Sequence, residues 1–175
     1  MKIFIAINLP KEIKYELYSI QGRLKNLGKV AWVPKKNFHL TLKFLGYIDE
    51  SKLALVKEKL AKIKPKKFKL TLNDIGFFPN ASKPRVVWIG ISPANKFIEL
   101  QHNIDAELLS LFPEPEKFTS HITLGRIKIL KNKELLKKLP MPQKLEFEVN
   151  SFGIMESKAT KDSPEYIVLE TYSIK

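Results

Sequence analysis

Two segments far apart in the chain share one pattern, in which a histidine and a threonine alternate with apolar residues. The first is His39-Leu40-Thr41-Leu42 and the second is His121-Ile122-Thr123-Leu124. Side chains at positions i and i+2 of a β-strand point to the same face of a sheet. Each histidine therefore shares a face with its threonine, while the apolar residues face a hydrophobic core. The pattern predicts two core strands that present the same two polar groups on their other face.

Helix and strand patterns alternate along the rest of the chain. Apolar alternation and β-branched residues predict strands over residues 2–8, 30–33, 38–46, 68–72, 85–91, 119–129, 145–155 and 166–174. Apolar residues at helical spacing predict helices from Pro10 to a stop at Gly28, from Ser51 to Ile63, from Ser92-Pro93 to a stop at Pro113, and from Asn132 to Leu139. Prolines and polar residues predict a loop over residues 77–84. This interleaving is typical of an α+β fold whose helices pack on the faces of its sheets.

The two halves of the chain resemble each other. Each contains a helix and a strand with the His-x-Thr-Leu pattern, which a glycine follows closely, Gly46 in the first half and Gly125 in the second. No low-complexity tract or interdomain linker separates them. A chain of 175 residues also lies within the usual size of one domain. We therefore expect one domain over residues 1–175, built from two pseudo-symmetric lobes.

Composition limits the functions that the chain can have. There is no cysteine, which excludes disulfide bonds, thiolate-ligated metal sites and a cysteine nucleophile. No apolar run approaches the roughly 18 residues of a membrane span, and the apolar start is too short for a signal peptide, so we expect a cytoplasmic protein without membrane contact. The formal net charge of +13 favours a polyanionic partner, although a lysine-rich solvated surface would give the same charge.

Two histidines that face one substrate can act as general base and general acid on opposite sides of a reacting centre, because the imidazole pKa lies near neutrality. The hydroxyl groups of Thr41 and Thr123 would donate hydrogen bonds to oxygens held between the rings. Two cations, Lys43 on the His39 face and Arg126 after the second motif, suit an anion with several oxygens. Together these groups are typical of phosphodiester chemistry.

A metal site is the main alternative use of two histidines. Zinc sites usually take three or four protein ligands from His, Cys and carboxylates. The chain has no cysteine, and neither motif contains an aspartate or a glutamate. The third histidine, His102, falls on the polar side of its predicted helix. We therefore expect neither a metal nor another cofactor.

The paired motifs resemble the signature of the 2H phosphoesterase superfamily, and specifically the RNA 2′,3′-cyclic phosphodiesterases, which are also called 2′-5′ RNA ligases. The resemblance spans nearly the whole chain. It includes residues 4–10 (FIAINLP), 32–34 (WVP), 37–46 (NFHLTLKFLG), 87–90 (VWIG), 121–126 (HITLGR) and 152–158 (FGIMESK).

This resemblance implies a bilobal α+β fold in which two antiparallel sheets line a central cleft and helices pack on the outer faces. It implies an enzyme that opens the 2′,3′-cyclic phosphate end of an RNA to a 2′-phosphate without a metal. His39 would be the proton donor to the departing 3′ oxygen, and His121 would be the proton acceptor from water. Thr41 and Thr123 would bind the phosphate oxygens, and Arg126 would neutralise developing charge.

Strand alternation conflicts with this assignment at Arg126. Ideal alternation places its side chain on the apolar face, with Ile122 and Leu124. A β-bulge at Gly125 would turn the side chain back to the cleft. Without a bulge, Arg126 would be a surface charge at the end of its strand.

Two other functions remain open at this point. A ribose hydroxyl that attacked in place of water would join two RNA ends, such as tRNA halves, through a 2′-5′ bond at the same site. The chain could also be a basic RNA-binding module whose site is inactive. The sequence argues against this alternative, because both His-Thr pairs are intact. The expected partner in each case is RNA, bound by a monomer.

Overall fold

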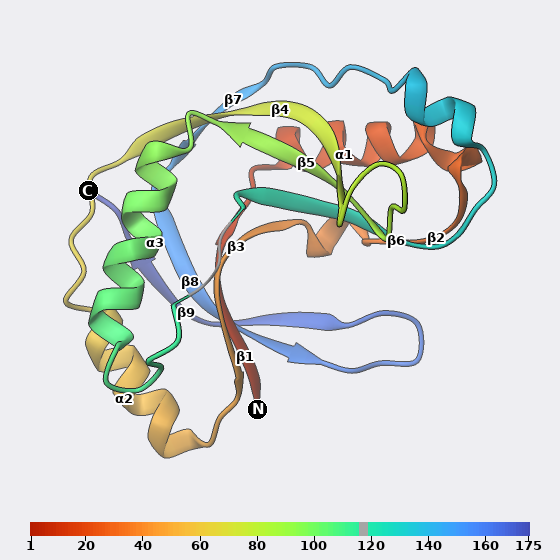
Figure 1. Cartoon of the computed structure of the whole chain (residues 1–175). Helices are drawn as coiled ribbons and strands as arrows, with labels where there is room; N and C mark the ends of the chain where they lie inside the picture. Colours follow the sequence, from red (N-terminus) through yellow and green to blue (C-terminus); the bar gives the residue numbers. More distant parts are fainter. Residues whose placement is uncertain (116–118) are drawn as a thin grey trace.

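Two antiparallel sheets form the centre of the molecule in the computed structural model, which describes residues 1–115 and 119–175 (Figure 1). The first sheet has the strand order β3-β1-β8-β9 and consists of β1 (Lys2–Asn8), β3 (His39–Tyr47), β8 (Ser151–Lys158) and β9 (Glu165–Ser173). The second has the order β2-β6-β5-β4-β7 and consists of β2 (Gly28–Trp32), β4 (Phe68–Phe78), β5 (Val86–Ser92), β6 (His121–Leu130) and β7 (Glu146–Val149). Each sheet thus contains one motif strand, β3 or β6.

Two of the helices each follow a strand of one sheet in the chain but cover the outer face of the other sheet. Helix α1 (Lys11–Arg23) follows β1 of the first sheet but packs on the second, where its Gln21 bonds to the backbone of β6. Helix α3 (Asn95–Leu108) follows β5 of the second sheet but packs on β3 of the first, beside α2 (Glu50–Leu60) (Figure 1). Short 3-10 helices lie in the connections: η1 (Lys25–Leu27) between α1 and β2, η2 (Lys35–Asn37) between β2 and β3, and η3 (Lys133–Lys137) between β6 and β7. This arrangement leaves the inner faces of both sheets for a cleft.

Strand β1 is buried on both of its faces, which fixes its place at the centre of the first sheet. Ile3, Ile5 and Ile7 belong to the main hydrophobic core under the helices. Phe4 and Ala6, on the inner face, form a second small cluster that also contains Met155 and packs against a tyrosine of β9. Burial of both faces removes apolar area from water on each side of the strand, so β1 holds the sheet in one register.

The predicted α+β fold with two antiparallel sheets is confirmed, and several element boundaries differ. The segment 145–155, predicted as one strand, forms β7 and β8, which pair with β4 in the second sheet and β1 in the first. Strand β4 continues to Phe78, where a loop was expected, because Arg85 N donates to Phe78 O at 2.7 Å. Helix α2 begins at Glu50 and not at Ser51, and it is capped by Asp49, which accepts from Lys52 N at 2.8 Å. In the part of the chain that the structure describes, no helix is long and apolar enough to cross a membrane.

Candidate active site

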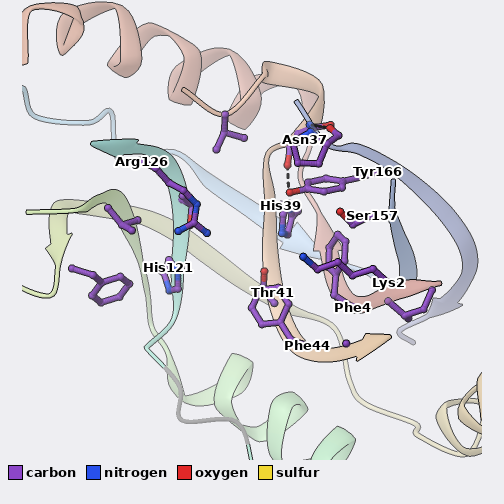
Figure 2. Close-up of a pocket in the computed structure, with 17 residues that line it drawn as sticks. Lys2, Phe4, Asn37, His39, Thr41, Phe44, His121, Arg126, Ser157 and Tyr166 are labelled. Carbon is purple, nitrogen blue, oxygen red and sulfur yellow. Dashed lines mark hydrogen bonds between the residues drawn. The ribbon is translucent and has the colours of Figure 1, made fainter. Parts of the chain in front are cut away.

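The two motif strands face each other across a cavity of about 730 Å³. Five of the six residues that the sequence singled out line the cavity, namely His39, Thr41, His121, Thr123 and Arg126, whereas Lys43 does not. Figure 2 shows His39 and Thr41 on one side of the pocket, with His121 and Arg126 on the opposite side. Strands β3 and β6 also contact each other directly. The structure therefore brings together two motifs that the sequence could only place on separate strands.

Both histidine rings are held by the same kind of hydrogen bond to the main chain. Nδ1 of His39 lies 2.7 Å from the main-chain oxygen of Asn37, and Nδ1 of His121 lies 2.6 Å from that of Thr119. A carbonyl oxygen only accepts hydrogen bonds, so Nδ1 of each ring carries a hydrogen. This leaves Nε2 of each ring as the nitrogen that can give or take a proton. The carbonyl two residues before each histidine therefore fixes both the tautomer and the orientation of the ring.

Aromatic rings pack against each imidazole. His39 packs against Phe4 and Tyr166, with ring centroids 4.9 and 5.2 Å apart. His121 packs against Phe78 and Trp88, at 4.9 and 6.0 Å. Apolar walls restrict the rotation of each ring and remove water from it, so the cationic form of each histidine is disfavoured.

The pKa of each histidine is lowered from its ordinary value of 6.5. Burial is the main cause in both cases, and the hydrogen bond to the preceding carbonyl opposes it. For His39, the positive charges of Lys14 and His121 lower the pKa further. The charge of His121 therefore reaches His39 across the cavity.

A β-bulge brings Arg126 into the cavity. Between β5 and β6, Trp88 pairs with Thr123 and Val87 pairs with Gly125, so Leu124 is an extra residue without a partner on β5. The extra residue shifts the alternation by one position and turns the Arg126 side chain to the His121 face. The bulge that the family resemblance required is thus present. The charge of Arg126 also reaches Tyr166 across the cavity, where it opposes the rise in the tyrosine pKa that burial causes.

The first motif has a bulge at the equivalent position. The prediction that Lys43 lies on the same face as His39 is therefore wrong. Between β1 and β3, Ala6 pairs with Thr41 and Ile5 pairs with Lys43, so Leu42 is the extra residue. Lys43 therefore points away from the cavity and is 2% exposed, with Nζ 2.5 Å from the Asp105 carboxylate of α3. Alternation from His39 holds only as far as Thr41, because the bulge reverses the faces beyond it.

Phe44 occupies in the first lobe the position that Arg126 has in the second, three residues after the threonine. It lines the cavity and is 60% exposed. The two motif strands therefore present a cation on one wall of the cavity and an aromatic ring on the other. Sequence reasoning missed this residue because ideal alternation places it in the core with Leu42.

The bulge in β6 is supported from outside the sheet by α1. Nε2 of Gln21, a buried side chain, donates to Leu124 O at 2.9 Å and to Val33 O at 2.8 Å. A β-bulge interrupts the ladder of main-chain hydrogen bonds, and buried carbonyl groups need partners. Gln21 supplies these bonds and so holds the backbone that orients Arg126.

Asn37 and Tyr166 complete the His39 side of the site, and sequence reasoning singled out neither. The buried side chain of Asn37 donates to Pro164 O at 2.6 Å, which links the start of β3 to the loop before β9. Tyr166, on β9, then packs edge-on against the His39 ring. Asn37 was detectable as the residue whose carbonyl lies two positions before a histidine. Tyr166 had no local signal, because only strand pairing brings β9 to the site.

Two consecutive parts of the chain, residues 7–88 and 89–166, each match the family described as LigT like Phosphoesterase. The chain belongs to the LigT-like phosphoesterase family. Each matched part of this LigT-like chain contains one His-x-Thr motif. The resemblance to 2H phosphoesterases that the motifs indicated is therefore confirmed.

Relatives of the LigT-like chain are similar over their full length. The RNA 2′,3′-cyclic phosphodiesterase of Methanocaldococcus jannaschii is 36% identical over 98% of this chain and 100% of that protein. The protein of the same name from Thermotoga maritima is 35% identical over 97% and 93%. The solved structure of TT0787 of Thermus thermophilus is 30% identical, with a TM-score of 0.86 over 99% of this chain and 98% of that one. That of Escherichia coli LigT complexed with 3′-AMP is 26% identical, with a TM-score of 0.82 over 99% and 97%.

The donor set of the site does not resemble a metal centre. Among the described residues, no group of three or more His, Cys, Asp and Glu side chains is placed to hold a metal ion. The third histidine, His102, is exposed on α3 and does not line the cavity that contains the motif histidines. The two motifs and Arg126 instead offer the cavity two imidazoles, two threonine hydroxyl groups and a guanidinium group, which is a set suited to an oxyanion.

Proposed function

We propose that this LigT-like phosphoesterase hydrolyses the 2′,3′-cyclic phosphate ends of RNA to 2′-phosphates without a metal. The observation that carries the proposal is the pair His39 and His121, held on opposite walls of one cavity with the same ring nitrogen bound to a carbonyl. Relatives named RNA 2′,3′-cyclic phosphodiesterase support the substrate. The solved structure of Escherichia coli LigT complexed with 3′-AMP supports a nucleotide as a ligand of this fold.

In the proposed reaction, Nε2 of His121 takes a proton from a water molecule whose oxygen attacks the phosphorus. The bond between phosphorus and the 3′ oxygen breaks on the opposite side, and Nε2 of His39 donates a proton to that oxygen. The 2′ ester bond stays intact, so the product is a 2′-phosphate. The two imidazoles have then exchanged protonation states, and proton exchange with solvent restores them.

Three further groups would bind the phosphate during this reaction. The hydroxyl groups of Thr41 and Thr123 donate to the non-bridging oxygens from the two walls of the cavity. The Arg126 guanidinium, turned inward by the bulge, offsets the negative charge that builds up when water adds to the phosphorus. Each lobe thus contributes a proton-transfer group and a hydroxyl group, and the second lobe adds the cation.

The direct test is incubation of an RNA oligonucleotide that ends in a 2′,3′-cyclic phosphate, followed by identification of the product. We expect a 2′-phosphate end, formed at the same rate with and without EDTA, because no step uses a metal. A 3′-phosphate product, or loss of turnover in EDTA, would contradict the proposed reaction. A joined product from tRNA halves would show that a ribose hydroxyl replaces water at this site.

The pH dependence follows from the lowered pKa of both histidines. His121 must be neutral to accept a proton, so the rate rises as the pH passes above its pKa. His39 must be protonated to donate, so the rate falls as the pH passes above its own pKa. We expect a bell-shaped profile of kcat/KM, which reports the free enzyme, centred on the acid side of the ordinary value of 6.5.

The profile of kcat is expected at higher pH than that of kcat/KM. The bound substrate places a negative phosphate between the two rings, which favours their cationic forms and raises the pKa of both. Steady-state kinetics over a pH series at constant ionic strength measures both profiles. A kcat/KM profile that rose steadily into the alkaline range would contradict the assignment of an acid and a base to these histidines.

A further inference from the structure

A second hollow continues from the active-site cavity along β6. It has a volume of about 550 Å³ and shares Val86 and Arg126 with the cavity that contains the histidines. Its other side is formed by residues 82–85, which precede β5. The two hollows therefore meet at Arg126, and the second, called the β6 groove below, leads outward from the phosphate site.

The β6 groove is lined by four cations: Lys83, Arg85, Arg126 and Lys128. All four are exposed, and none of the described residues that line the groove is acidic. None of the four forms an ion pair within the described part of the chain, whereas many other lysines pair with a glutamate. The charge of the groove is therefore not neutralised by the protein, and it favours a polyanion.

Arginine is rare in this chain, but most of its arginines line the β6 groove. The chain contains three arginines, Arg23, Arg85 and Arg126, and two of them line the β6 groove. The guanidinium group binds a phosphate through two parallel hydrogen bonds, which a lysine cannot do. A lysine-rich surface by itself therefore does not account for the residues found here.

The backbone that carries these cations is fixed on both sides of the groove. Arg85 N donates to Phe78 O at 2.7 Å, and Arg85 O accepts from Ile127 N at 2.8 Å. Asn80 Oδ1 accepts from the main-chain nitrogen of Lys83 at 3.0 Å. The cationic side chains are thus presented from an ordered edge, so binding there needs little ordering of the protein.

We propose that the β6 groove binds the backbone phosphates of the RNA strand that precede its cyclic-phosphate end, so that the preferred substrate is an oligonucleotide. This inference rests on the proposed function, since it places the terminal phosphate between His39 and His121. The strand then runs outward along β6, with the next phosphates beside Lys128, Arg85 and Lys83. A mononucleotide cyclic phosphate occupies only the inner cavity and gains nothing from the groove.

The test compares two triple variants that each remove three positive charges. The groove variant is Lys83→Gln/Arg85→Gln/Lys128→Gln, which leaves Arg126 in place. The control variant is Lys62→Gln/Lys64→Gln/Lys66→Gln, at exposed positions in the segment between α2 and β4 that do not line the β6 groove. Turnover is measured on a decamer that ends in a 2′,3′-cyclic phosphate and on the mononucleotide cyclic phosphate of the same base.

We expect the groove variant to lose on the order of tenfold in kcat/KM on the decamer at low salt, because it loses contacts to phosphates. Its kcat/KM on the mononucleotide should equal that of the wild type, and the control variant should equal the wild type on both substrates. An unchanged rate of the groove variant on the decamer would overturn the inference. So would an equal loss on both substrates, or an equal loss in the control variant.

A binding measurement separates the groove from the reaction. Fluorescence anisotropy with a labelled decamer that ends in a 3′-phosphate gives the affinity and its salt dependence without turnover. We expect weaker binding by the groove variant alone, and a slope of log K against log salt that is shallower by about 0.7 for each lost contact. Equal affinities of the groove variant and the wild type would overturn the groove proposal. An enzyme that turned over neither substrate would instead contradict the proposed function.

Discussion

Replacing either His39 or His121 with glutamine is expected to lower kcat by roughly 10³-fold, because each variant removes one of the two proton transfers of the reaction. Glutamine keeps a polar group of similar reach but cannot exchange a proton near neutral pH. The double variant should lose little more than either single one, since the two groups act on the same step. The measurement is the initial rate of 2′-phosphate formation from a cyclic-phosphate oligonucleotide.

The pH profile distinguishes the two histidines. The His121→Gln variant should lose the acid limb of the profile, because no base remains to be deprotonated. The His39→Gln variant should lose the alkaline limb, because no acid remains to lose its proton. The reverse pattern would exchange the two roles.

The matched control is His102→Gln, at the exposed histidine of α3. It should leave both kcat and the pH profile unchanged. Equal thermal unfolding of the three variants would show that lost activity is not lost folding. If the His39→Gln and His121→Gln variants formed 2′-phosphate at the wild-type rate, the two-histidine mechanism would be wrong for this protein.

Replacing Lys43 with methionine is expected to lower the free energy of unfolding by about 3 kcal/mol, because it removes the buried cation beside the partly buried Asp105 carboxylate. Lys43 is 2% exposed and Asp105 is 15% exposed, with their charged atoms 2.5 Å apart. Lys43 Nζ also donates to Glu114 O at 3.1 Å, so the substitution removes a second bond. Gln101 still donates to Asp105 at 2.6 Å, which compensates for part of the loss.

Urea unfolding followed by circular dichroism measures this effect. The matched control is Lys137→Met, which breaks the exposed pair with Glu134 and should change stability by less than about 0.5 kcal/mol. The double variant Lys43→Met/Asp105→Leu should recover part of the loss, because it removes the buried charge as well. A Lys43→Met protein as stable as the Lys137→Met control would contradict the role of this pair in joining α3 to β3.

Much of the site was predictable because it depends on local pattern. Strand alternation puts His39 with Thr41 and His121 with Thr123, and both pairs line the cavity. The apolar rows opposite them are buried, as the pattern required. The duplication of the motif also predicted two lobes, and the sheets that contain β3 and β6 correspond to them.

Alternation failed at the residues just beyond each threonine, and for one physical reason. A bulge inserts one residue into a strand and exchanges the two faces from that point onward. Leu42 and Leu124 are the inserted residues, so Lys43 turns to the helices, while Phe44 and Arg126 turn to the cavity. The register that creates a bulge is a property of two paired strands, and a single strand sequence does not contain it.

The sequence by itself determined which groups are candidates for the chemistry, since His39, Thr41, His121 and Thr123 follow from short periodic segments. It also determined the α+β class, because helix and strand periodicities depend on neighbouring residues. Only the tertiary structure decided that the two motifs face one cavity, that Tyr166 packs on His39, and that residues 145–155 divide between two sheets. These outcomes depend on which strands pair and in which register, and pairing between distant segments is selected by the packing of the whole core.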